Sequence, residues 1–453
     1  VGNPPWEKLK VEINEFMSRY VSGFKGLTPT EQRDIAHNFF VENERIEKIY
    51  LKERELTEKY RKAIVNSGFA GISSGDPELY QSFCQQFLRL LRKSGRLAVV
   101  LPRSAFASKG NAEFRRNLVE NASNISVMIL ENKRRWLFDI DPRLNVVFLD
   151  AHLGDDSSNS ITLFPLVDSY EKFVMHSGDS NTISLDYITK LSPIITLPSL
   201  PIIFQQESLS LLEDISHFPK TITAAPWGCN LYSDYHPSKI KKILSSEPNS
   251  NSITIITGGS INPFKIDMNS QYGYVPRQLV ETKLVEILDN NRIFLRRIAS
   301  STNTRTIICG YGSGVLAVEN AQIIEITGNP PERIELFLLG VFNSLVFDWV
   351  ARRYIETTVN KFIFENFRIP REFNDDSFNE ICDLVEQQIN TFDPKVATRI
   401  DFLVCGIYGL SLKGIEVICS TFHHDGTIEG MPWEERFNAI AKYYNIQQRG
   451  VIE

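Results

Sequence analysis

Val1-Gly2-Asn3-Pro4-Pro5-Trp6, the first six residues of the chain, join a predicted buried strand to a stiff polar turn. The two prolines fix φ and push the residues before them into extended conformations. Asn3 and Pro4 should therefore present carbonyl oxygens from a non-helical turn, with the ring of Trp6 close by. An ordinary loop is the competing interpretation of this tetrapeptide taken alone.

Such a turn suits chemistry at an amino group that is conjugated to a ring, where the nitrogen lone pair is delocalised. Two acceptors, the Asn3 side-chain oxygen and the Pro4 main-chain carbonyl, would hold the two N–H groups and aim the lone pair. Trp6 would stack on the ring, a contact of about 1–3 kcal/mol by alanine substitution in nucleic-acid binding proteins. No metal or strong base is needed, because the alkylated nitrogen becomes acidic and loses its proton afterwards.

Helical and strand patterns alternate in the next part of the chain. We predict helices over 76–91 and 113–120, and short buried strands over 96–101, 125–130 and 146–149. This alternation predicts an α/β fold, part of a doubly wound, Rossmann-like parallel sheet. Ligands of such sheets bind at the carboxyl ends of the strands, and the Asn3 turn sits at one of those ends.

The tetrapeptide resembles motif IV of the amino-methyltransferases that use S-adenosylmethionine to methylate adenine N6 or cytosine N4 in DNA. Segments similar to motifs V, VI, VII and VIII follow in the family's order, at 76–87, 95–102, 106–118 and 133–143. The resemblance implies that Asn3, Pro4, Pro5 and Trp6 are catalytic. It also implies that Phe138 packs against the target base from the side opposite Trp6. A core position is the alternative for Phe138.

The family's glycine-rich motif I, which bends around the methyl donor, has no counterpart in this sequence. The nearest glycine cluster, 309–314, comes far too late, and we interpret it as a turn. In the subclass where motif I precedes motif IV, it would lie upstream of Val1. We therefore expect an upstream N-terminal part or partner subunit, and only the edge of the S-adenosylmethionine pocket at Asn3 and Pro4.

Three domains are expected. A catalytic methyltransferase domain over 1–155 carries a helical insertion at about 11–68, and the polar run Asp155–Ser160 marks its end. A mixed α/β target-recognition domain follows over 160–372, and a helical C-terminal region over 373–453. The stretch 328–370 resembles the helix and Ile-Pro loop of target-recognition domains in type IIG restriction-modification enzymes and phage-defence relatives.

The formal net charge of −6 excludes a uniformly basic nucleic-acid coat but not a local basic cleft. Several basic residues are candidates for contact with DNA, although an ordinary surface charge is the alternative for each. They are Lys133, Arg134, Arg135, Arg292, Arg296, Arg297, Arg352 and Arg353.

Cysteine usage and hydropathy indicate the setting. The six cysteines include no CxxC pair, which favours a reducing cytoplasm over a disulfide framework or a structural zinc site. No apolar run approaches the roughly 20 residues needed to cross a bilayer, so no membrane partner is expected. The adjacent His423 and His424 lack partners at ligand spacing, and no metal site is expected.

The resemblance implies a site-specific DNA methyltransferase that acts on adenine N6 of a flipped-out base in double-stranded DNA, within a restriction-modification or phage-defence system. The choice between adenine N6 and cytosine N4 stays open. Two other classes remain as alternatives. The chain could be a DNA-binding specificity module that is inactive without its donor-binding half, or a methyltransferase acting on protein glutamine or on RNA.

Overall fold

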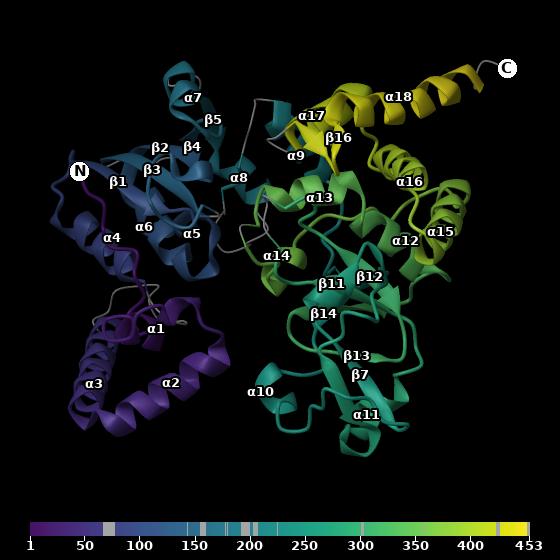
Figure 1. Cartoon of the computed structure of the whole chain (residues 1–453). Coiled ribbons are helices and arrows are strands. Elements are labelled where there is room, and N and C mark those ends of the chain that lie inside the picture. Colours follow the sequence, from purple (N-terminus) through teal and green to yellow (C-terminus); the bar gives the residue numbers. More distant parts are fainter. Residues whose placement is uncertain are drawn as a thin grey trace. The chain divides into compact units, whose positions relative to one another are not determined.

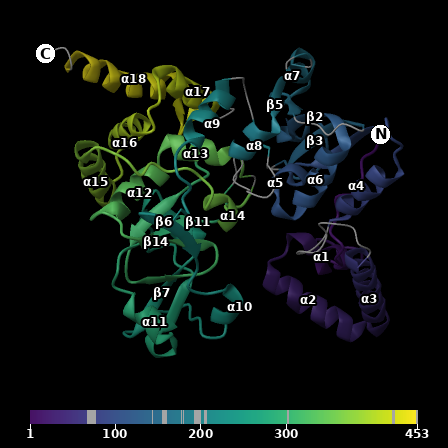
Figure 2. The same cartoon turned by 180° about the vertical axis from the view of Figure 1, so that it is seen from behind.

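The computed structural model divides the chain into two compact units (Figures 1 and 2). Unit 1 comprises Val1–Met128 with Val146–Thr162, and unit 2 comprises Ile129–Asn145 with Leu163–Glu453. The predicted three-domain limits stay predictions, and the run 155–159 lies outside the described residues. The structure describes residues 1–66, 78–142, 144–154, 160–176, 178, 180–191, 200–202, 207–223, 225–299, 303–355, 357–422 and 426–450.

The predicted helical insertion is present in unit 1. A capping box joins Thr28 and Glu31 at the start of the first of its two long helices, since each side chain meets the main chain of the other residue. The insertion has its own small core of Phe16, Met17 and Phe24. Its elements are α1 (Ile13–Met17), η1 (Phe24–Gly26), α2 (Pro29–Glu42) and α3 (Glu44–Asn66).

The α/β part of the chain is built on a five-stranded sheet with the order β1-β3-β2-β4-β5. The fold class is as predicted, with mixed α/β sheets followed by a helical C-terminal region. The elements here are α4 (Leu79–Leu90), β1 (Arg96–Pro102), α5 (Ser104–Ala107), η2 (Lys109–Asn111), α6 (Ala112–Asn121), β2 (Ala122–Glu131), η3 (Lys133–Arg135), β3 (Asn145–Leu153), β4 (Ser160–Leu163) and β5 (Asn181–Ser184).

One pairing corrects the wholly parallel arrangement that the sequence suggested. β3 runs antiparallel to β1, with the register Arg96↔His152 at one end and Pro102↔Val146 at the other. Only the short η3 turn lies between β2 and β3 among the described residues. A parallel connection requires a crossover of a dozen or more residues, usually an α-helix, and none is present there.

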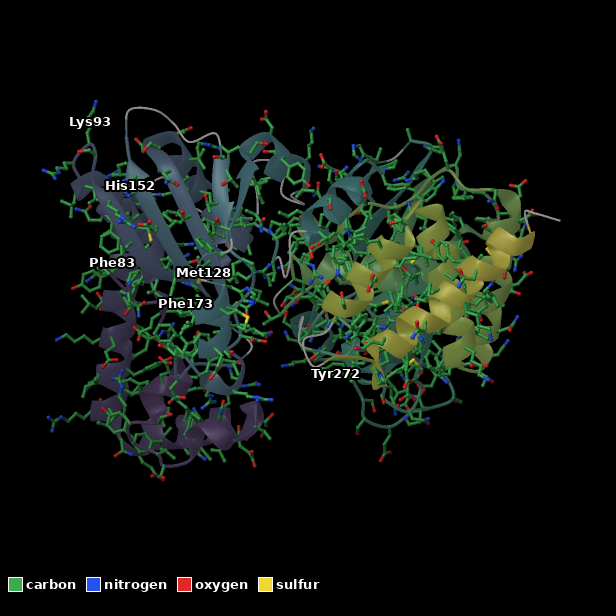
Figure 3. The ribbon with its side chains drawn as sticks, turned by 90° about the horizontal axis from the view of Figure 1, so that it is seen from above. Phe83, Lys93, Met128, His152, Phe173 and Tyr272 are labelled. Carbon is green, nitrogen blue, oxygen red and sulfur yellow. The ribbon has the colours of Figure 1, made fainter. Side chains whose placement is uncertain are left out.

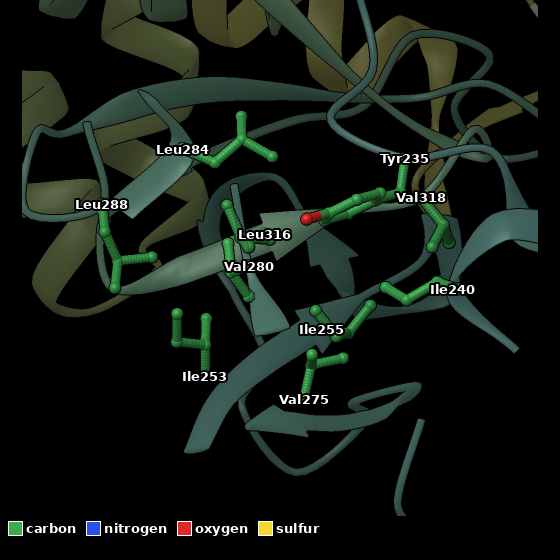
Figure 4. Close-up of a cluster of buried hydrophobic side chains, with 10 residues drawn as sticks. All are labelled: Tyr235, Ile240, Ile253, Ile255, Val275, Val280, Leu284, Leu288, Leu316 and Val318. Atoms are coloured by element: carbon green, nitrogen blue, oxygen red, sulfur yellow. The ribbon is translucent and has the colours of Figure 1, made fainter. Parts of the chain in front are cut away.

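The β-rich part of unit 2 contains two sheets, ordered β6-β14-β11-β12-β9-β8 and β10-β7-β13. A hydrophobic cluster packs on the smaller sheet and includes Ile253, Ile255, Val275 and Leu316 (Figure 4). The elements are β6 (Trp227–Tyr232), α10 (Pro237–Ile240), β7 (Ser252–Ile256), η4 (Gly258–Ser260), β8 (Ile261–Asn262), β9 (Phe264–Ile266), β10 (Gly273–Pro276), η5 (Arg277–Leu279), α11 (Thr282–Glu286), β11 (Arg292–Arg296), β12 (Cys309–Gly312), β13 (Val315–Ala317) and β14 (Ala321–Gly328).

Helices make up most of the rest of unit 2, including its C-terminal end. No single helix among the described residues is long and apolar enough to cross a bilayer. Helices α12 and α13 reach the required length and apolar character only when taken together, and this pair is bent by 53°. Both are buried helices. The remaining elements are α7 (Tyr170–Met175), α8 (Leu185–Leu191), α9 (Glu207–Ser216), α12 (Ile334–Phe342), α13 (Leu345–Arg352), α14 (Lys361–Phe364), α15 (Asp375–Asn390), α16 (Pro394–Ile407), α17 (Leu412–Phe422), β15 (Thr427–Ile428), β16 (Met431–Pro432) and α18 (Trp433–Gly450).

Candidate functional site

The Asn3-Pro4-Pro5-Trp6 turn begins directly after a residue that pairs with β1. Gly2 forms a parallel bridge to Val99, in which the Gly2 N–H donates to Ala98 O at 2.9 Å. The Val100 N–H donates to Gly2 O at 3.0 Å. Because the two segments run in the same direction, the turn leaves the sheet at the edge where β1 also ends.

The side chains of the turn differ in exposure. Asn3 and Pro5 are exposed, Pro4 is buried and Trp6 is half-buried. Burial of Pro4 anchors the turn, and exposure of Asn3 leaves its amide oxygen accessible to a ligand. The two expected acceptors are therefore neighbours in sequence on a short, anchored turn.

Helix α4 is docked on the segment that follows the turn. The Leu79 N–H donates to Glu7 O at 2.9 Å, and Lys8 bridges Glu78 in antiparallel fashion. At its other end the helix places Phe87 beside the turn, since a Cβ added to Gly2 would lie 3.6 Å from the Phe87 ring. Phe83, one turn earlier on α4, lies toward the outside of unit 1 (Figure 3).

A buried polar network supports the loop that follows β1. Asn111 Nδ2 donates to Tyr80 Oη at 2.8 Å, to Ser104 O at 3.0 Å and to Ser108 Oγ at 2.6 Å. Its Oδ1 accepts from Gln81 Nε2 at 3.0 Å. Burial raises the pKa of Tyr80, so this phenol stays protonated at neutral pH. The network joins α4 to the loop at the carboxyl end of β1.

Arg115 on α6 holds the same loop from the other side. Its Nη1 donates to Ala105 O and to Ser108 O, both at 2.9 Å. Burial lowers the pKa of Arg115 to about 10, and the group remains a cation at neutral pH. The sequence interpretation missed Arg115 and Asn111. The sequence did contain a signal for them, because both are polar residues that follow a buried strand ending in proline.

The loop that carries Phe138 is fixed by one buried amide in unit 2. The Leu137 and Phe138 N–H groups donate to Asn132 Oδ1 at 3.3 and 3.1 Å, and Asn132 Nδ2 donates to Phe138 O at 2.8 Å. Trp136 Nε1 donates to Glu131 O at 2.7 Å. Phe138 is half-buried, and its pairing with Trp6 across a base stays a prediction.

The basic residues of this loop meet solvent. Arg134 and Arg135 are exposed and have left-handed φ values of 61° and 55°. Arg135 Nη1 lies 3.0 Å from Asp139 Oδ1, so its charge is partly compensated. The Lys133 side chain lies outside the described residues. The predicted contacts of Lys133, Arg134 and Arg135 with DNA remain predictions.

The prediction that Arg352 and Arg353 face DNA was wrong, because both are buried. Arg352 is 2% exposed, and its Nη2 donates to Asn303 O and Thr304 O at 2.8 and 2.7 Å. Arg353 is 1% exposed, and its Nη2 donates to Thr421 O at 3.1 Å. Both guanidinium groups bind main-chain carbonyls inside unit 2.

Arg292 is a second correction. Its side chain is buried and pairs with the fully buried Asp234 at 3.1 Å. Arg296 and Arg297 are half-buried. The guanidinium of Arg296 donates to Gly258 O at 2.9 Å, and Arg297 pairs with Glu319. These contacts assign Arg292 to the interior and leave Arg296 and Arg297 as weaker candidates.

The glycine cluster at 309–314 is mainly strand, which corrects its interpretation as a turn. β12 pairs with β11 and with β9, and a Cβ added to Gly310 would lie 2.6 Å from Lys265 O. These glycines thus serve close strand packing. The expected edge of an S-adenosylmethionine pocket at Asn3 and Pro4 stays a prediction.

Metal ligands do not gather anywhere in the described residues, where no group of three His, Cys, Asp or Glu side chains could hold an ion. His423 and His424 lie outside those residues. All six cysteines are free and buried.

No protein-family model matches the chain, and no curated protein matches it. Among solved structures, the chain is similar to the Type IIL restriction-modification enzyme MmeI in complex with DNA, at 11% identity and a TM-score of 0.46, over 80% of this chain and 54% of that chain. It is also similar to a nuclease-deletion mutant of the Type ISP restriction-modification enzyme LlaGI with a DNA substrate mimic, at 11% identity and a TM-score of 0.40, over 87% and 41%. The chain thus spans about half of the MmeI chain.

Proposed function

We propose that this chain carries the catalytic turn and the target-recognition part of a site-specific DNA methyltransferase. The methyl group of S-adenosylmethionine would be transferred to adenine N6, in a restriction-modification or phage-defence system of the cytoplasm. One observation carries the proposal: the Asn3-Pro4-Pro5-Trp6 turn leaves a segment parallel to β1 at the carboxyl edge of an α/β sheet. That edge is where ligands of such sheets bind.

The chemistry follows from the two acceptors of the turn. Asn3 Oδ1 and Pro4 O accept the two N6 hydrogens, which directs the nitrogen lone pair away from the ring. The donor, when bound, supplies an electrophilic methyl carbon on a sulfonium. Asn3 and Pro4 would hold the amine nitrogen in line with that methyl carbon, and the methylated nitrogen would afterwards lose one proton to water. Most of the rate comes from positioning.

The base must leave the duplex to reach the turn, at a cost of a few kcal/mol. Stacking on Trp6 offsets part of that cost, and Phe138 is proposed to cover the other face. The rigid Asn132 loop supports this role for Phe138, because an aromatic ring on a fixed loop loses little freedom when a base binds. Arg134 and Arg135 are proposed to meet phosphates from the same loop.

Donor binding is assigned only in part to this chain. Asn3 and Pro4 would form the edge of the pocket, and the rest would come from an upstream part of the same protein or a partner subunit. A specificity module without catalysis is the second candidate function, and the lack of a glycine cradle at 309–314 favours it. Methyl transfer in the presence of the upstream part separates the two, because a module without catalysis should keep full transfer when Asn3 is replaced by Ala.

Asn3 and Trp6 variants test the proposal. Asn3→Ala should lower methyl transfer to DNA with little loss of DNA binding, whereas Trp6→Ala should mainly weaken capture of the base. Asn66→Ala, which alters an exposed asparagine on α3, is the matched control and should change neither. Full turnover by Asn3→Ala, in the presence of the upstream part, would overturn the assignment.

A further inference from the structure

Three cations meet where two distant segments of unit 2 pair. Lys220 lies between α9 and β6, and Arg368 and Arg371 follow α14. Lys220 and Arg368 form an antiparallel bridge, and Arg371 Nη2 donates to Lys220 O at 2.8 Å. We call Lys220, Arg368 and Arg371 the cation cluster. The sequence interpretation singled out none of these three residues.

Neutral oxygens hold the cation cluster in place. Lys220 Nζ donates to Asn366 Oδ1 at 2.8 Å. Arg368 Nη1 donates to Phe218 O at 3.3 Å, and its Nη2 donates to Lys190 O at 3.2 Å. No carboxylate forms an ion pair with any of the three within the described part of the chain. The positive charge is therefore bound but not neutralised.

This differs from the sites of Arg436 and Arg305, two buried arginines of unit 2. Arg436 lies 2.7 Å from Asp401, and Arg305 lies 2.8 Å from Glu429. Those cations have acidic partners and are buried, as expected for charges with a structural role. The cation cluster instead consists of three half-buried residues, with the Arg371 Nε and Nη1 atoms buried and its Nη2 supporting the main chain at Lys220.

The protonation equilibria agree with an unneutralised charge. Burial and then the charge of Arg368 lower the pKa of Lys220. Burial also lowers the pKa of Arg368 and of Arg371. An anion placed beside the cluster would favour the charged forms and reverse these shifts.

The cluster is also rigid before any ligand arrives. The Arg371 guanidinium lies over the Trp227 ring at 4.3 Å from its centroid. The Tyr408 hydroxyl donates to Arg368 O at 2.7 Å, which fixes the main chain beneath the Arg368 side chain. Ordering of these side chains on binding therefore costs little, which favours affinity.

We propose that the cation cluster is a binding site for phosphates of the duplex DNA backbone, an inference that rests on the proposed function. Guanidinium groups match phosphate oxygens in a fixed fork, and lysine adds a point charge. Phosphate contacts carry no sequence information, so the cluster positions unit 2 on the duplex without reading bases. In a chain of net charge −6, a local group of this kind supplies the attraction that the whole surface lacks.

The salt dependence of duplex binding tests this site. The full chain and its Lys220→Gln and Arg368→Gln variants are titrated with two labelled duplexes of unrelated sequence over a range of salt concentrations. Each variant should bind both duplexes more weakly and reduce the slope of log K against log[salt] by about 0.9 for each lost contact. Lys283→Gln, which alters an exposed and paired lysine on α11, should leave the slope unchanged.

Lys220→Arg separates charge from packing. It keeps the charge and should retain the slope of the native chain. Native slopes in both glutamine variants would overturn the proposed phosphate site. The proposed function would still stand, because the Asn3 and Trp6 variants test it separately. An equal loss of slope in Lys220→Arg and Lys220→Gln would also overturn the phosphate site. A native chain that binds neither duplex at low salt would contradict the cluster and the proposed DNA recognition together.

Discussion

Asn132 holds Phe138 by both of its main-chain polar groups. The Phe138 N–H donates to Asn132 Oδ1 at 3.1 Å, and Asn132 Nδ2 donates to Phe138 O at 2.8 Å. Asn132 is fully buried, so neither bond exchanges readily with water. The Asn132 side chain thus supplies the hydrogen-bond partners that main-chain groups of a strand would find in a neighbouring strand.

Removal of this amide should loosen the loop. Asn132→Ala removes the amide that bonds both the N–H and the C=O of Phe138, and we expect the free energy of unfolding to fall by about 1–3 kcal/mol. Urea unfolding followed by tryptophan fluorescence measures the change. Asn121→Ala removes an exposed amide that donates to Asn117 O and should cost much less. Equal effects of the two variants would show that the Asn132 bonds add nothing.

Asn111 should matter for the catalytic edge of unit 1. Asn111→Ala removes the bonds to Tyr80, Ser104, Ser108 and Gln81, and should destabilise the loop after β1 by about 1–3 kcal/mol. Hydrogen exchange of the 103–111 amides measures the local loss. Asn117→Ala, which removes one bond to Gln85, is the control. Native protection in Asn111→Ala would contradict the network.

Arg352 should act on stability and not on DNA binding. Arg352→Gln leaves the fully buried Asp348 without one of its cations, and loss of one partner of a buried pair costs about 3–5 kcal/mol. Thermal unfolding should show that loss, while the salt slope of duplex binding stays native. Arg277→Gln at an exposed position should leave both unchanged. A reduced salt slope in folded Arg352→Gln would restore the original sequence interpretation.

We expect Glu429 to stabilise the fold at neutral pH and to lose this effect in acid. The charge of Arg305 holds the pKa of Glu429 below its ordinary value of 4.5. The unfolded chain therefore binds this proton more readily, so the stabilisation is present above about pH 4.5 and is lost as pH falls through the lowered value. Glu429→Gln should reduce stability at neutral pH and should converge with the native chain in acid. Parallel stability profiles from pH 7 to acid would contradict this.

Local patterns predicted much of the fold. The predicted helix that became α4, the short apolar run that forms β1 and the helical insertion depend on near neighbours in sequence. The direction of β3 did not follow, because alternating helices and strands do not reveal a missing crossover. The position of the Asn3 turn at a strand end followed from prolines that stop a strand.

The arginines show why site residues are harder to predict from sequence than helices and strands. Charge and clustering made Arg352 and Arg353 candidates for DNA contact, but their partners at Thr304 and Thr421 lie far away in sequence. The cation cluster was missed for the same reason, since Lys220 and Arg368 meet only through the fold. Basic residues can be sorted into buried and available sets only when their partners are known.

Transfer of labelled methyl groups to unmodified bacterial DNA, followed by nucleoside analysis, tests the central claim most directly. The chain is assayed alone and together with the protein encoded immediately upstream of Val1. We predict label in N6-methyladenine when the upstream protein is present, and loss of that label in Asn3→Ala. Absence of label from DNA under both conditions would contradict the account and would favour a chain that only recognises DNA, or a protein or RNA substrate.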